Sequence, residues 1–150
     1  MDNARISTEL ILVSRLLSVP KFGASKYYHV TQTNNVGKIK KNGIIPFQTS
    51  NWIKGTGERY GNGEVFVFEK LKDAIRWSGK MDWEQNKEMG TGKISVVEVK
   101  DTSDWDTDSA DPLGQAASDG KWLKRMKAVS PDDIGKSFAV TIDKIKKVTL

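Results

Sequence analysis

The sequence predicts an α+β fold with a mixed β-sheet, and two observations lead to this prediction. In the first half of the chain, stretches rich in β-forming residues at 27–30, 64–68 and 93–100 are separated by helical patterns. In the second half, strand patterns follow an acidic loop without regular helices between them. Irregular alternation of this kind favours α+β over a doubly wound parallel sheet.

Length and composition predict one domain spanning residues 1–150, with an N-terminal helix over 1–23 and a core over 24–150. No window approaches the roughly 20 apolar residues that a membrane helix needs, and residues 9–13 are too few for a signal-peptide core. The chain has no cysteine, which excludes disulfides and thiolate chemistry. We therefore expect a cytoplasmic protein without a membrane partner.

The first predicted unit, residues 27–46, contains the only histidine, His29. Its β-forming start predicts a strand, and the hydroxyl of Thr31 or Thr33 is expected to cap the short helix that follows. Gly43 follows a run of lysines, where a left-handed helix end needs a residue without Cβ. From the residues alone, His29 is either a site residue or a packed strand histidine.

The loop over 47–63 is rich in glycine, but its spacing fits neither a dinucleotide-binding turn nor a phosphate loop. Trp52, Arg59 and Tyr60 are its candidate ligand contacts, and a surface loop with packed aromatics explains them equally well.

Further elements follow in order. A buried strand is predicted over 64–68, and a helix is predicted over 70–80 with Trp77 and Met81 packed together. In the strand over 93–100, period two places Glu98 on the face of Ile94 and Val96. Later predictions are a helix start at 130–133, a strand over 137–141 and a last strand over 145–150.

Two charged stretches are candidate sites. Asp104, Asp106 and Asp108 alternate as in a calcium loop, but the glycine and glutamate that such a loop requires are missing, which favours a solvated acidic loop anchored by Trp105. The segment 120–127 is basic with helical spacing. Because the net charge is +5, this segment is the best candidate for nucleic-acid binding, although a solvated helix face explains it too.

The order Tyr-His-Val-Thr, a short helix and Lys-Asn-Gly-Ile-Ile-Pro over 27–46 resembles the start of ADP-ribosyltransferase-like domains. The glycine loop, the strand over 63–68, the helix around 73–77 and the strand over 93–99 are similar in order and spacing. The resemblance covers roughly residues 27–150. It implies a mixed, split β-sheet with short flanking helices, and NAD as a substrate with no metal.

The resemblance also implies roles for particular residues. His29 would contact the ribose of NAD, Thr31 would line the same cleft, and Tyr60 or Phe66 would lie against nicotinamide. The basic excess of the chain also suits a pyrophosphate, with Arg59 and Lys54 as its candidate contacts. Relatives carry an acid on a late strand, where this chain has Ser137. Asp132, Asp133, Glu98 or one of Asp104 to Asp108 could substitute for that acid. The catalytic candidates are therefore His29, Tyr60, Glu98 and Asp106.

Three functions follow as hypotheses. The first is a mono-ADP-ribosyltransferase, of the phage or toxin effector type, that modifies a host protein or nucleic acid. The second is a binding protein or inhibitor that has this fold without the acid. The third is a nucleic-acid binder that uses Lys121–Lys127 and the lysines around 38–41.

Overall fold

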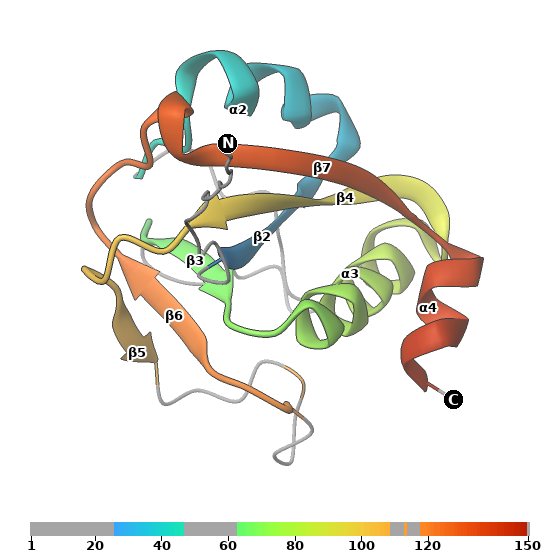
Figure 1. The fold of residues 1–150 in the computed structure, drawn as a ribbon. Coiled ribbons are helices and arrows are strands. Elements are labelled where there is room, and N and C mark those ends of the chain that lie inside the picture. The colour runs from blue at the N-terminus through green and yellow to red at the C-terminus, as the bar shows by residue number, and fades with distance from the viewer. Residues whose placement is uncertain (1–25, 47–62, 109–112, 114–117, 150) are drawn as a thin grey trace, which may run out of the picture.

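The computed structural model describes residues 26–46, 63–108, 113 and 118–149. These residues form one six-stranded sheet with a few short helices, shown in Figure 1. The predicted α+β class is therefore confirmed. Each strand pairing is antiparallel among the described residues, so the prediction of a mixed sheet is wrong. The predicted N-terminal helix over 1–23 lies outside the described residues, as does most of the glycine loop.

The strand order is β5-β6-β3-β2-β4-β7. The strands span β2 Lys26–Gln32, β3 Val65–Phe68, β4 Thr91–Lys100, β5 Asp106–Asp108, β6 Trp122–Arg125 and β7 Ile134–Thr141. The α-helices span α2 Val36–Asn42, α3 Leu71–Asn86 and α4 Ile142–Thr149. Two 3-10 turns, η2 Thr33–Asn35 and η3 Pro131–Asp133, precede α2 and β7.

One apolar cluster lies on the sheet face that α3 covers, and we call this face the α3 face. The cluster joins aromatic side chains of β3 and β6 to Trp77 and Met81 of α3, as the predicted helical pair requires. Phe68 and Trp122 meet edge to face, with ring centroids 4.9 Å apart. The cluster extends to Ile145 of α4. This segment was predicted as a strand, but Ile142, Ile145 and Val148 recur at helical spacing, and Ile145 is buried.

The second cluster lies on the opposite face, which we call the α2 face. Here Ile39 of α2 and Ile44 pack against valines of β3 and β4 and against Leu123 of β6. A backbone bridge between Ile44 and Val129 closes this side. Gly43 has φ +80°, and a Cβ at this position would lie 1.9 Å from the Val129 carbonyl oxygen. The predicted need for a residue without Cβ is confirmed, and the close approach of Val129 gives it a second reason.

Other local predictions have mixed outcomes. Ser130 caps η3 by accepting a hydrogen bond from the Asp132 N–H, as predicted. Neither Thr31 nor Thr33 caps α2, because Thr31 is still in β2 and the cap position is Asn35, whose side chain does not bond the first turn of the helix. The segment 121–127, predicted with helical spacing, is largely the strand β6. No helix among the described residues is long and apolar enough to cross a membrane.

Candidate functional site

His29 lies where the six-stranded sheet is joined most weakly. Strand β2 pairs with β4 along all seven of its residues. Its pairing with β3 has a single aligned position, Tyr28 opposite Phe68. The imidazole of His29 bridges this joint, because its Nδ1 lies 2.8 Å from the carbonyl oxygen of Phe66. A side chain thus makes a contact between two strands that pair through only one aligned position.

The bond to Phe66 fixes the state of the ring. A carbonyl oxygen only accepts hydrogen bonds, so Nδ1 of His29 carries a proton and donates it. Burial lowers the pKa of His29 below its ordinary value of 6.5, and the hydrogen bond to Phe66 opposes this only in part. The ring is therefore neutral at neutral pH, and its Nε2 presents a lone pair. Such a nitrogen can accept a hydrogen bond from a hydroxyl group.

Polar side chains continue along the α2 face from His29. Thr31 follows two residues later on the same face and is fully buried. Thr33 donates a hydrogen bond to the Gly92 carbonyl oxygen at 2.6 Å. Because its one proton is used there, Ser95 is the donor in the 2.7 Å bond between the two hydroxyls. The α2 face is thus polar near η2, at Thr31, Thr33 and Ser95. Valines of β3 and β4 fill the rest of this face.

Ser137 lies in the same cross-strand row as His29. Val97 of β4 pairs with His29 on one side and with Ser137 of β7 on the other. Directly paired residues point to the same face of a sheet, so both side chains lie on the α2 face. Two strand spacings separate their backbones by about 10 Å. The position where the family resemblance expects an acid therefore faces the same side as His29, but it carries a hydroxyl.

Glu98 lies on the other side of the sheet. It is paired directly with Tyr28, one residue before His29, and successive side chains alternate between faces. Its carboxylate lies 3.4 Å from Lys26 Nζ and accepts a 3.3 Å bond from the Lys136 N–H, beside an irregularity in the β4–β7 pairing. The predicted shared face with Ile94 and Val96 is confirmed, because both residues belong to the cluster under α3. The same alternation keeps Glu98 away from the His29 imidazole.

Phe66 meets His29 only through its backbone. Its ring packs against Trp122, with centroids 4.9 Å apart, in the cluster on the α3 face. A nicotinamide stacked on this ring would therefore lie on the opposite face from the imidazole. The structure thus brings the His29 side chain to the Phe66 backbone, but the two side chains do not line the same cleft.

Asp106 is exposed on the edge strand β5, opposite Lys124. The order β5-β6-β3-β2 places it three strands from His29, about 14 Å between backbones. Its neighbours Asp104 and Asp108 are paired with basic side chains. No group of three or more potential metal-ligating side chains occurs within the described part of the chain. Arg59 and Tyr60 lie outside the described residues, so their predicted roles stay predictions.

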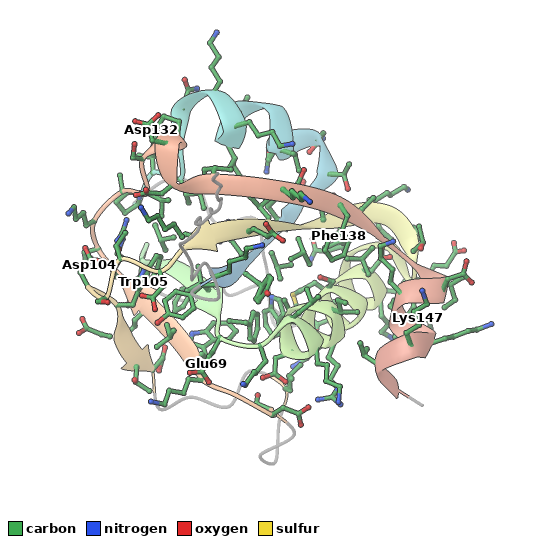
Figure 2. The ribbon with its side chains drawn as sticks, viewed as in Figure 1. Glu69, Asp104, Trp105, Asp132, Phe138 and Lys147 are labelled. Carbon is green, nitrogen blue, oxygen red and sulfur yellow. The ribbon has the colours of Figure 1, made fainter. Side chains whose placement is uncertain are left out.

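Arg125 is not part of a basic surface. It is 6% exposed and stacks on Trp105, with its guanidinium carbon 4.4 Å from the ring centroid. Its N–H groups donate to four acceptors: the carbonyl oxygens of Lys127 (3.0 Å) and Ala128 (2.7 Å), the Thr102 hydroxyl (3.0 Å) and Asp104 Oδ1 (2.5 Å). The predicted anchoring role of Trp105 is confirmed, and Figure 2 labels it beside Asp104. The predicted basic patch at 121–127 thereby loses Arg125, and Lys124 is paired with Asp108.

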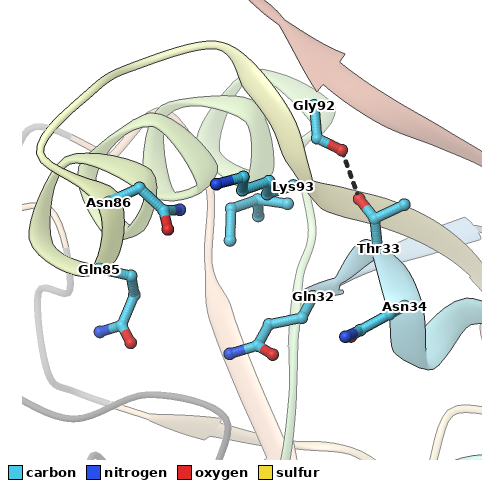
Figure 3. Close-up of a pocket in the computed structure, with 8 residues that line it drawn as sticks. Gln32, Thr33, Asn34, Gln85, Asn86, Gly92 and Lys93 are labelled. Atoms are coloured by element: carbon cyan, nitrogen blue, oxygen red, sulfur yellow. Dashed lines mark hydrogen bonds between the residues drawn. The ribbon is translucent and has the colours of Figure 1, made fainter.

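A second polar feature was missed by sequence reasoning. A cavity of about 550 Å³ opens where β2 ends, and amide side chains line it. Its residues come from four separate elements, β2, η2, α3 and β4 (Figure 3), so no local motif could have revealed it. No protein-family model matches the chain, and no curated protein is similar to it.

Proposed function

We propose that this protein binds NAD on the α2 face and transfers ADP-ribose to a macromolecule. The proposed contact is the cross-strand row of His29, Val97 and Ser137, which we call the His29 row. The proposal rests on the hydrogen bonding of the His29 imidazole. Its Nδ1 donates to the Phe66 carbonyl oxygen, and its Nε2 is left as an acceptor for a ligand. A ribose hydroxyl is a donor of the right kind for that nitrogen. The family resemblance of residues 27–46, with His29 at its ribose-contacting position, supports the same assignment.

The proposed reaction needs few chemical groups at the site. The bond between the nicotinamide nitrogen and C1′ of ribose breaks, and its electron pair leaves with nicotinamide. The acceptor's nucleophile forms the new bond to C1′ and loses its proton. The transition state resembles an oxocarbenium ion, so binding geometry and nearby negative charge lower the barrier. His29 would supply the geometry, and neither Glu98 nor Asp106 is assigned the negative charge.

Charge on the α2 face supports an anionic ligand. Helix α2 packs on this face through Ile39 and carries three exposed lysines, Lys38, Lys40 and Lys41. The chain as a whole has a net charge of +5. Such an excess favours a pyrophosphate or an acidic target by long-range attraction. The target of transfer is proposed only as a class, a host protein or nucleic acid.

A second candidate function is a binding protein that keeps the NAD-binding face without turnover. The observation that favours it is Ser137, a hydroxyl in the row where an acid would stabilise the developing cation. In this case the protein would hold NAD or a partner macromolecule in a stable complex. The two candidates share the His29 contact and differ only in catalysis.

Incubation with labelled NAD and a cell lysate tests the transfer, using two variants of His29. His29→Asn keeps an amide nitrogen near the position of Nδ1, so it retains a donor for Phe66 but removes Nε2. His29→Gln places its amide near Nε2 and loses the Phe66 bond. We expect His29→Asn to fold like the wild type and to lose label transfer. Transfer by His29→Asn at the wild-type rate would contradict the proposal.

Ser137→Glu separates the two candidates. If the chain is a binding protein that lacks only the acid, Ser137→Glu gains NAD hydrolysis that the wild type does not have. If the chain is a transferase, wild-type protein already transfers label. The thermal midpoint with and without NAD reports binding in both cases, because a ligand of the folded state raises it. No thermal shift with NAD and no turnover by either protein would rule out both the transferase and a protein that binds NAD.

A further inference from the structure

Three large apolar side chains are exposed where α3 ends and α4 begins. Trp83 of α3 is 54% exposed, Met89 in the turn after α3 is 42% exposed, and Ile142 at the start of α4 is 42% exposed. They are half of the six exposed large apolar side chains in the described part of the chain. We call these three residues the Trp83 patch.

Contacts at two glycines show that the members of the Trp83 patch are neighbours. The Met89 Cε atom lies 3.0 Å from the position of a Cβ on Gly79, which is one helical turn before Trp83. A Cβ on Gly90 would lie 2.4 Å from the backbone nitrogen of Ile142. The turn after α3 therefore folds back along the helix and brings Met89 between Trp83 and the start of α4. Exposed apolar side chains that gather in this way mark a surface for another molecule.

Hydrogen bonds at both ends fix the turn that carries Met89. At its start, the Lys87 N–H donates to the Trp83 carbonyl oxygen at 2.9 Å. At its end, the Thr91 N–H donates to the carboxylate of Asp82, which is buried, at 2.8 Å. Because the turn is already ordered, a partner that binds the Trp83 patch does not have to order it, and this favours association.

The charge near the Trp83 patch differs from that of the whole chain, which is +5. Within three residues of a patch residue, the sequence has three lysines and four acidic residues: Lys80, Lys87, Lys144, Asp82, Glu84, Glu88 and Asp143. This surface therefore lacks the basic excess by which nucleic acids and anionic membranes are bound. Two copies that each carry +5 can meet here without bringing two positive surfaces together.

The order of charges along α3 suits contact with a second α3. In a two-fold dimer both copies use the same surface, and each contact between two residues occurs twice. If two α3 helices lie antiparallel with the two-fold axis at Glu84, Lys80 of one copy lies opposite Glu88 of the other. The two Trp83 side chains then lie next to the axis, at the centre of the contact.

We propose that the Trp83 patch docks a second copy of this chain in a two-fold dimer. Tryptophan and methionine are enriched in the centres of protein interfaces, and charged side chains are found around their rims. Helix α3 covers one face of the sheet and His29 lies on the other, so a dimer of this kind leaves the α2 face accessible. The proposal therefore does not depend on the proposed binding of NAD.

Sedimentation of the full chain from about 1 μM to about 1 mM tests the proposal. We expect a reversible equilibrium between monomer and dimer. Trp83→Ala should raise its dissociation constant at least about thirtyfold, and Met89→Ala about fivefold. Leu71→Ala is the matched control, because Leu71 is also exposed on α3 but lies about three turns from Trp83. It should dimerise like the wild type, and thermal midpoints check that all three variants fold.

Charge reversal tests the two-fold arrangement. Lys80→Glu should weaken the dimer, and Lys80→Glu combined with Glu88→Lys should restore it. A wild type that is monomeric at every concentration, a dimer that Trp83→Ala leaves intact, or a double variant no tighter than Lys80→Glu would overturn the proposal. Binding of phosphatidylserine vesicles or a single-stranded oligonucleotide by a monomeric wild type, lost in Trp83→Ala, would identify a different occupant and overturn it too.

Discussion

His29 and Arg125 are both basic side chains on the α2 face, but their environments differ. Arg125 donates to four protein acceptors and stacks on Trp105. Within the described part of the chain, His29 has one hydrogen bond, which leaves its second ring nitrogen as an acceptor. A buried polar group whose bonds are all made within the protein is explained by folding alone. His29 is instead held in one orientation by Phe66 and keeps an acceptor nitrogen, which makes it a candidate for contact with a ligand.

Replacement of Arg125 should have the largest effect on stability. Arg125→Met removes the donors to two carbonyl oxygens and one carboxylate in the corner between β5 and β6. We expect the free energy of unfolding to fall by about 3 kcal/mol, measured by urea denaturation. Lys124→Ala, one residue away and partly exposed, is the control and should change stability by less than about 0.5 kcal/mol. Equal effects of the two would show that the Arg125 contacts contribute nothing specific.

Substitution of Gly43 tests how α2 packs on the face that holds His29 and Arg125. Gly43→Ala places a Cβ against the Val129 carbonyl oxygen at a positive φ. We therefore expect the free energy of unfolding to fall by about 2 kcal/mol. Gly37→Ala is matched to it within the same segment, because no atom lies within 4 Å of its added Cβ. This second change should be neutral or stabilise by up to about 1 kcal/mol. A thermal midpoint that falls equally in both variants would contradict the packing of α2 on this face.

The pH dependence of stability tests the neutral state of His29. Its pKa is lower in the folded protein than the ordinary 6.5, so the unfolded chain takes up the proton first. The stabilisation is complete above pH 6.5 and is lost as the pH falls from there towards the folded pKa. Denaturation of the wild type and of His29→Asn at several pH values in this window should show a slope that only the wild type has. Equal slopes would mean that His29 is not buried as a neutral ring.

Glu98 is expected to give the smallest effect. Its pair with Lys26 is partly exposed, with 47% and 22% of the two side chains accessible, so Lys26→Ala should cost no more than about 1 kcal/mol. Glu98→Gln should leave any NAD turnover near the wild-type rate, because the carboxylate lies on the other face from His29. Loss of turnover in Glu98→Gln with binding retained would assign the catalytic acid to Glu98.

The sequence predicted well those features that depend on local periodicity. The alternation in β4 correctly separated Glu98 and Val96 from Val97. The Trp77 and Met81 pair was correctly placed in the core. The need for glycine at position 43 was also correct, since one residue type tolerates its backbone conformation.

Features that depend on pairing between distant segments were not predictable. The segments 121–127 and 145–150 were assigned the wrong element type, because short apolar runs fit both periods until a neighbouring strand or helix decides. The separation of His29 from Glu98 depends on the register of β2 with β4, which places Glu98 opposite Tyr28. A single sequence carries no signal for that register, and none for the cavity built from four elements.

The central claim is that Nε2 of His29 is the acceptor that faces NAD. Because His29 is the only histidine, a proton–nitrogen correlation spectrum of its imidazole reports on one ring alone. We predict the neutral form with the proton on Nδ1 at neutral pH, and a saturable shift of the Nε2 resonance when NAD is added. A proton on Nε2, or an imidazole spectrum that NAD leaves unchanged, would contradict the account.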